Sequence, residues 1–151
     1  MAYSHIAHDC ILGKNVIIAN SVNLAGHVQI EEFAIVGGAC GIHQFIHIGK
    51  HAMIAASVMV RNDVPPYILA GREPLSYVGV NYRGLSRRNF SPETIKEIQE
   101  IYRIVFLSNN NNTQALGAVE KRFPISIERD EILSFIKNSK RGILKGYSFV
   151  K

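Results

Sequence analysis

The stretch Ile6-Ala7-His8-Asp9-Cys10-Ile11-Leu12 opens a pattern that decides the fold, because an aliphatic residue returns at every sixth position. This first register contains Ile6, Leu12, Ile18, Leu24, Ile30, Val36, Ile42, Ile48, Ile54 and Val60. Four positions after each comes a small or β-branched residue: Cys10, Val16, Val22, Val28, Ala34, Cys40, Ile46, Ala52, Val58 and Val64. An α-helix cannot keep such a period on one face. A hexad fits one short strand and a corner, so three hexads close a triangular 18-residue coil, and the repeat predicts a parallel β-helix.

The chain divides where this period stops. The stretch Asp63-Val64-Pro65-Pro66 ends it, since proline cannot donate to a strand ladder. Ser91 and Pro92 then predict a helix start, as N-cap and first helical residue, and helices are also expected at about 113–122 and 128–139. The predicted segments are a hexapeptide-repeat β-helix (1–64), a connecting loop and extended segment (65–90) and a C-terminal α-helical domain (91–151). The fold class is therefore all-β plus α.

Composition narrows the function classes. The chain contains no run of 18 apolar residues, which a membrane-spanning helix would need. Residues 1–5 lack the basic region and the apolar region that begin a signal peptide. Cys10 and Cys40 fall in the inward register, as expected for buried thiols of a reducing compartment, so we predict a cytoplasmic protein. The net charge of +5 suggests an acidic partner or substrate. The motifs and aromatic interleaving of nucleic-acid-binding modules are absent.

A β-helix ends in exposed sheet edges that need covers. The helical part can cover the C-terminal end, whereas no capping segment precedes the first hexad. We therefore expect either a longer chain or an edge strand from a partner chain.

Stacking predicts a candidate site. Residues 18 apart lie above one another, so the outward His8 shares a column with Gly26 and Gln44. The neighbouring columns hold Asp9, His27 and Phe45 on one side and His43 on the other. The residues expected to gather on one outer face are His8, Gly26, His27, His43 and Gln44.

Acyl transfer suits this cluster. Neutral imidazole can take a proton from a hydroxyl near neutral pH, and a glycine N–H can stabilise an oxyanion. The cluster lacks a serine or cysteine nucleophile, which favours direct attack by the acceptor hydroxyl. Three histidines with one open position could instead bind zinc, and any single histidine is more often an ordinary surface residue. Arg83, Arg87 and Arg88 could bind phosphate or form a solvated basic turn.

The string His5-Ile6-Ala7-His8-Asp9-Cys10 resembles the active-site segment of the acyl-[acyl carrier protein]–UDP-N-acetylglucosamine O-acyltransferase family, which begins lipid A biosynthesis. The resemblance covers essentially the whole chain. Its further motifs, in the family's order, are Leu24-Ala25-Gly26-His27-Val28, the segment from Gly37-Gly38 to His43-Gln44-Phe45, Asp63-Val64-Pro65-Pro66-Tyr67, Gly79-Val80-Asn81, Gly84-Leu85-Ser86-Arg87-Arg88 and Arg141-Gly142-Ile143.

The resemblance implies a left-handed coil, a homotrimer with sites between subunits, and no cofactor or metal. It implies transfer of a β-hydroxyacyl group from acyl carrier protein to the 3-hydroxyl of UDP-N-acetylglucosamine. His8 would be the general base, Asp9 its orienting group and the Gly26 N–H the oxyanion donor. Ala56 would set acyl-chain length, and the substrate contacts would be His5, His27, His43, Gln44, Asn81, Arg87 and Arg88.

Family members carry several more coils before this point, including residues that touch substrate. Two alternatives to the O-acyltransferase stay open. One is a truncated, inactive trimeric fragment of that enzyme, and the other, which rests on the histidines, is a zinc-dependent hexapeptide enzyme.

Overall fold

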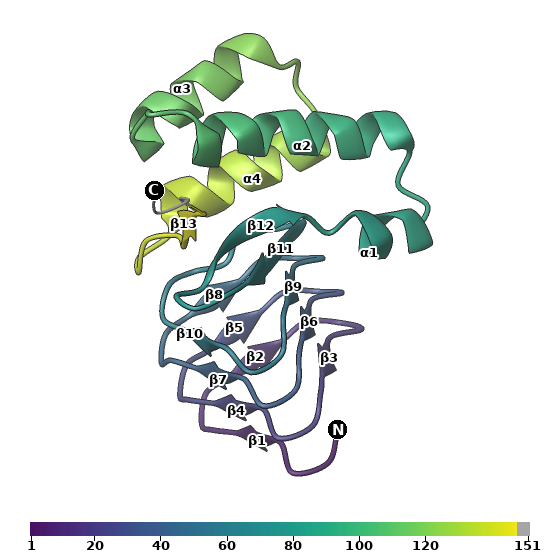
Figure 1. Cartoon of the computed structure of the whole chain (residues 1–151), viewed down its shortest axis with the longest axis vertical. Helices are drawn as coiled ribbons and strands as arrows, with labels where there is room; N and C mark the ends of the chain where they lie inside the picture. The colour runs from purple at the N-terminus through teal and green to yellow at the C-terminus, as the bar shows by residue number, and fades with distance from the viewer. Residues whose placement is uncertain (148–151) are drawn as a thin grey trace.

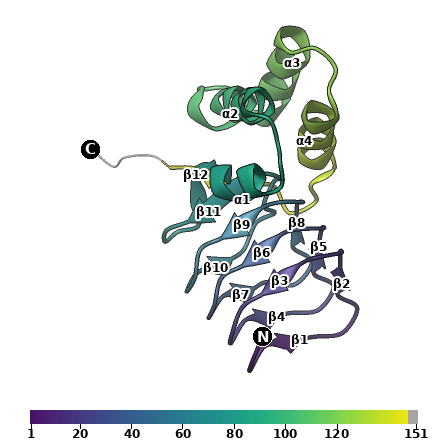
Figure 2. The same ribbon diagram turned by 90° about the vertical axis from the view of Figure 1, so that its right-hand side faces the viewer.

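The computed structural model describes residues 1–147, which form a triangular β-helix with helices packed on its C-terminal end (Figures 1 and 2). Each side of the triangle is a parallel sheet, and the coil is left-handed. The first sheet contains β1 (His5–Ile6), β4 (Asn23–Leu24), β7 (Gly41–Ile42) and β10 (Met59–Val60). The second contains β2 (Ile11–Leu12), β5 (Gln29–Ile30) and β8 (His47–Ile48). The third begins with β3 (Ile17–Ile18), β6 (Ile35–Val36) and β9 (Met53–Ile54).

The strand pairing confirms the predicted 18-residue coil. His5 pairs with Asn23, and Ile11 pairs with Gln29, one coil later in each case. Between strands the chain turns through a residue in the left-handed region, with φ between 56° and 63°. These corner residues recur at every sixth position: Tyr3, Asp9, Asn15, Ser21, His27, Phe33, Ala39, Phe45, His51 and Ser57. One hexad is therefore one short strand and one corner.

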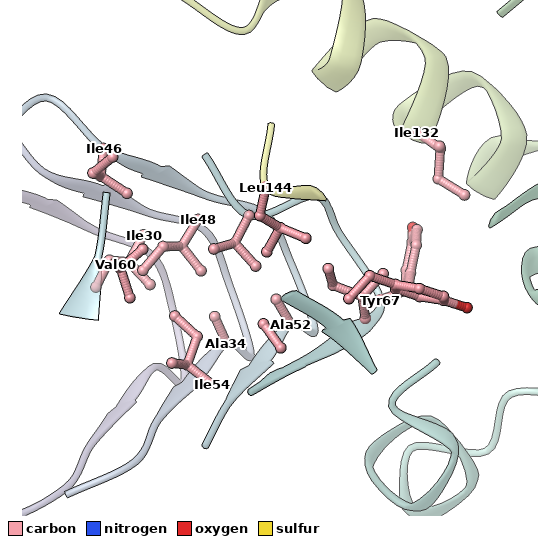
Figure 3. Packing of buried hydrophobic residues seen from close by; sticks show 14 of the residues in the cluster. Ile30, Ala34, Ile46, Ile48, Ala52, Ile54, Val60, Tyr67, Ile132 and Leu144 are labelled. Atoms are coloured by element: carbon pink, nitrogen blue, oxygen red, sulfur yellow. The ribbon is translucent and has the colours of Figure 1, made fainter. Parts of the chain in front are cut away.

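Both inward registers form the core. Ile30 and Ile48 lie on neighbouring strands, and Ala34 and Ala52 are also inside the coil (Figure 3). Burial begins only in the second coil, since Ile6 is 47% exposed whereas Leu24 above it is 1% exposed. The apolar edge expected at the N-terminal coil is thus uncovered among residues 1–147.

The connecting segment contains more regular structure than the loop with extended pieces that the sequence suggests. β11 (Ile68–Gly71) pairs in parallel with β9, and β12 (Ser76–Val80) pairs antiparallel with β11. The third sheet therefore continues beyond the predicted end of the β-helix. A short helix, α1 (Tyr82–Arg87), follows, and its N-cap is Asn81.

Three longer helices complete the described chain. In α2 (Pro92–Leu107) the Ser91 side chain caps the first turn, as predicted. The helices α3 (Asn112–Arg122) and α4 (Ile127–Asn138) begin one residue earlier than expected. The chain then adds β13 (Lys145–Gly146) beside β12, and residues 148–151 of the predicted C-terminal segment lie outside the described residues. None of the helices within residues 1–147 has the length and apolar character needed to span a membrane.

A polar seam joins α4 to the coil. Glu131 on α4 accepts hydrogen bonds from the Lys50 Nζ, at 2.6 Å, and from the Tyr67 hydroxyl. After α4, the Ser139 hydroxyl donates to the carboxylate of buried Asp63, at 2.6 Å. These contacts fix the position of α4 against the last coils.

Candidate functional site

A cluster of histidine and aspartate side chains lies at one corner of the β-helix, between the first and second sheets. Asp9, His27 and Phe45 occupy this corner on successive coils, each in the left-handed conformation. The Asp9 Oδ2 lies 2.8 Å from His8 Nδ1 and 3.8 Å from His27 Nε2. The His27 ring stacks on Phe45, with centroids 4.8 Å apart and planes at 9°. The corner therefore brings together residues from the two columns that the sequence predicts to be neighbours.

The His8 imidazole lies against the backbone of Gly26 on the next coil. A Cβ atom built at Gly26 would come within 2.6 Å of His8 Cε1 and 2.7 Å of Nε2. Glycine is thus needed here for a close approach, not for a positive φ. Within residues 1–147 the Gly26 N–H donates no hydrogen bond, which leaves a donor beside the ring.

Electrostatics favour an anionic Asp9 beside His8. The hydrogen bond from His8 lowers the Asp9 pKa, and the charge of His27 lowers it further. Because carboxylate only accepts, this bond puts the proton of neutral His8 on Nδ1 and leaves Nε2 as an acceptor. The His8 side chain is 72% exposed, so that nitrogen is accessible to a ligand.

The other predicted residues on this face have separate surroundings. His43 is exposed and accepts a hydrogen bond from the Arg141 guanidinium, at 2.8 Å. Gln44 is exposed in the His8 column, and its carbonyl lies 3.4 Å from His43 Nδ1. His5 is exposed on β1. Thus His8, Asp9, Gly26 and His27 form a tight cluster, while His5, His43 and Gln44 lie around it.

A groove begins at the same corner and runs toward the end of α4. Its volume is about 520 Å³, and its lining includes His27, Phe45, Asp63, Lys140 and Arg141. Arg141 was not among the predicted site residues. Its proximity to His43 depends on residues 98 positions apart, and the only sequence signal is the Arg141-Gly142-Ile143 motif.

The residues expected to bind nucleotide lie at a different corner. Asn81 is buried, and its side chain donates to the His51 carbonyl at 2.9 Å and caps α1 through the Gly84 N–H. Arg88 lies over the Phe33 ring, 4.9 Å from its centroid, and Arg87 is exposed at the end of α1.

The corner that holds Phe33 and His51 separates the second and third sheets, so one chain does not join these residues to the His8 cluster. Ala56 is exposed next to Ser57, a residue of the third corner. One chain thus distributes the predicted site residues over three corners.

A cation could be held only where donor atoms converge. Within the described chain, His8, Asp9 and His27 are one such group, with one ligand atom from each within 4.8 Å of the others.

Comparison with known proteins agrees with this architecture. The family described as "Udp N-acetylglucosamine O-acyltransferase; Domain 2" matches residues 63–144, more than half of the chain. The acyl-[acyl-carrier-protein]–UDP-N-acetylglucosamine O-acyltransferases of Thiobacillus denitrificans and Herminiimonas arsenicoxydans are 37% and 41% identical to it, over 96% of this chain in both cases. The chain spans 56% and 57% of the lengths of these two proteins.

The structural comparison gives the same relationship. A crystal structure of LpxA, a UDP-N-acetylglucosamine acyltransferase from Bacteroides fragilis, matches with a TM-score of 0.93 and 43% sequence identity. The match covers 94% of this chain and 56% of that one. Sequence and structure together show that the chain belongs to the UDP-N-acetylglucosamine O-acyltransferase family.

Proposed function

We propose that the chain catalyses transfer of a β-hydroxyacyl group from acyl carrier protein to the 3-hydroxyl of UDP-N-acetylglucosamine, the first step of lipid A biosynthesis. His8 Nε2 takes the proton of the attacking sugar hydroxyl, whose oxygen forms a bond to the thioester carbonyl carbon. The resulting oxyanion is stabilised by the Gly26 N–H. When the C–S bond breaks, the proton returns from His8 to the sulfur, which leaves as the carrier-protein thiol.

The observation that carries this proposal is the position of the His8 ring, bonded to Asp9 on one side and lying against Gly26 on the other. The 2.8 Å bond to Asp9 orients the ring and stabilises the imidazolium that forms during transfer. The close approach of His8 and Gly26 puts a base and an unused N–H donor beside each other. This arrangement supplies proton transfer and charge stabilisation without a side-chain nucleophile.

The acting form in this proposal is a homotrimer. The His8 cluster and the residues Asn81, Arg87 and Arg88 lie at different corners of one β-helix. Three-fold packing of coils would place one corner of a chain against another corner of its neighbour. His27, His43 and Gln44 then contact the sugar or the acyl group, and His5 makes a contact on the phosphate side. Asn81, Arg87 and Arg88 bind the nucleotide and its diphosphate.

Acyl carrier protein is the proposed acyl donor because the relatives' names include it and because this chain carries a net charge of +5. Basic residues follow α4 at the mouth of the groove, including Lys140 and Arg141, where they could contact an acidic partner. Ala56, exposed and small, would admit a long acyl chain. Two free cysteines fit a reducing compartment, and we propose the cytoplasm.

The test is transfer from β-hydroxyacyl carrier protein to UDP-N-acetylglucosamine by the chain, with His8→Ala and His8→Gln for comparison. General acid–base catalysis contributes roughly 100-fold or more, so both variants should lose at least that factor. Because His8 is largely exposed, their melting temperatures should match that of the parent. Activity retained in both variants would remove His8 from the mechanism.

A second candidate is a trimeric scaffold without activity. The same assay tests it, because the chain spans 56% of the length of the Thiobacillus denitrificans relative. If the parent and both His8 variants form folded trimers that transfer no acyl group, the chain is an inactive scaffold.

A further inference from the structure

We infer that His8, Asp9 and His27 form a binding site for one Zn²⁺ ion, and that the ion, bound to Nδ1 of His8, leaves the proton of neutral His8 on Nε2, the nitrogen proposed as the base. The ion acts here as an inhibitor and not as a cofactor. The inhibitory part of this inference rests on the proposed function, whereas the binding part does not.

The donor geometry suits a small transition-metal ion. In a tetrahedral site with ligand distances of about 2.1 Å, neighbouring ligand atoms lie about 3.4 Å apart. Asp9 Oδ2 lies 2.8 Å from His8 Nδ1 and 3.8 Å from His27 Nε2, on either side of that value. One ligand atom from each of the three residues lies within 4.8 Å of the others. Two imidazoles and a carboxylate are ligands that Zn²⁺ accepts.

The fold holds these donors in place before an ion arrives. Asp9 and His27 stand at one corner on successive coils, and the His27 N–H donates to the His8 carbonyl at 3.1 Å. Phe45 stacks on one face of His27, and the His8 and His27 rings lie at 86° to each other with centroids 5.1 Å apart. The His8 ring packs closely against the backbone of Gly26. A rigid scaffold of this kind lowers the entropy lost when the ion binds.

Occupation of the site changes the proton position on His8. Zn²⁺ on Nδ1 replaces the hydrogen bond to Asp9, so neutral His8 must carry its proton on Nε2. That nitrogen then has no lone pair with which to accept the proton of a hydroxyl. One ion therefore occupies the orienting carboxylate and inactivates the base, with no change in the fold.

The test begins with binding of metal alone to the full chain. Zn²⁺ titration by calorimetry should give one site per chain, and Co²⁺ as a spectroscopic probe should show the visible absorption of a tetrahedral site. Losing an outer-shell partner weakens metal sites about tenfold or more, so losing a direct ligand in Asp9→Asn or His27→Ala should cost at least as much. The control His43→Ala, which removes a histidine outside the cluster, should bind as the parent does.

The tautomer of His8 supplies a second readout that needs no turnover. Nitrogen NMR of the imidazoles should show the His8 proton moving from Nδ1 to Nε2 as Zn²⁺ is added. If His27→Ala bound Zn²⁺ as tightly as the parent, the proposed site would be wrong. It would also be wrong if the Co²⁺ complex showed a near-ultraviolet thiolate band that vanished in Cys10→Ala, since Cys10 would then be a ligand. An unmoved His8 proton, or transfer activity that persists with the site filled, would overturn the inhibitory part of the inference. A chain without turnover would refute the proposed function and leave the binding and NMR results readable.

Discussion

His8 and Gly26 lie one coil apart, and the imidazole occupies the space where any side chain at position 26 would have to begin. The Cβ of a larger residue would come within 2.6 Å of the ring. Side-chain identity on one coil thus controls the position of the proposed base on another.

Gly26→Ala should therefore lower the rate of acyl transfer by about 100-fold, the lower end of a general base's contribution, because the methyl group displaces His8. The fold should survive, since the ring is exposed and free to move outward. The measurement is the transfer rate beside the thermal melting curve.

Gly117→Ala is the matched control, because nothing lies within 4 Å of a Cβ at that glycine of α3. It should stabilise the helix by about 0.5–1 kcal/mol and leave transfer unchanged. Parent-like activity in Gly26→Ala would separate His8 from catalysis.

Stability should fall with acid because of His51. This side chain is buried among Phe33, Tyr67 and Phe90, and burial, with the charge of Arg88, lowers its pKa from 6.5 to about 4. His51 binds a proton below pH 6.5 in the unfolded chain but only below about pH 4 in the folded chain. The free energy of unfolding is therefore unaffected by this residue above pH 6.5 and decreases as the pH falls from 6.5 to about 4. The loss attributable to this residue is at most about 3.4 kcal/mol.

His51→Phe should flatten that part of the pH profile. The His51 Nδ1 is buried with no hydrogen-bond partner within residues 1–147, so an aromatic ring without nitrogen removes an unsatisfied group. Urea unfolding of parent and variant at pH 4.5 and 7.5 measures the difference. An equal acid-induced loss in both proteins would refute the assignment to His51.

The polar seam should contribute to stability through Glu131. Its replacement by alanine leaves the Tyr67 hydroxyl, in a largely buried side chain, without its acceptor and frees Lys50 from one partner. A cost of about 1–3 kcal/mol is expected for such a loss. Chemical unfolding measures it, and Glu120→Ala, at an exposed position of α3, should stay within about 0.5 kcal/mol of the parent. Equal stability in the two variants would mean that the seam contributes nothing.

A trimer predicts a melting temperature that rises with protein concentration, because association is linked to folding. Sedimentation at micromolar concentration should give three times the 16.8 kDa mass of one chain. A monomer under these conditions would contradict both the trimer and the proposed site between subunits.

The coil was predictable from sequence because its period is independent of the rest of the chain. Burial of Leu24 and Val28, and the contact of His8 with Gly26, follow directly from stacking at 18 residues. The strands β11 and β12 were not predicted as a continuation of the sheet, because the hexad ends before them and only pairing with β9 reveals their place.

Contacts between the helical part and the coil were beyond sequence reasoning for a similar reason. The bond of Lys50 to Glu131 joins residues 81 positions apart, and that of Arg141 to His43 joins residues 98 apart. Periodicity shows which residues share a column but not which side of the triangle a later helix covers. The buried environment of His51 was missed in the same way, since the coil pattern alone makes it an outward corner residue.

The coil geometry also restricts how this protein can change in length. Neighbouring coils are in register at 18 residues, so an added unit of that size before His8 would leave the His8, Asp9 and His27 corner intact. An insertion of six residues between Asp9 and His27 would keep every inward residue inside yet rotate His27 to another corner. The hexad pattern would be kept after that insertion but the proposed site would not, so single hexads can be added without loss of the site only away from the His8, Asp9 and His27 corner.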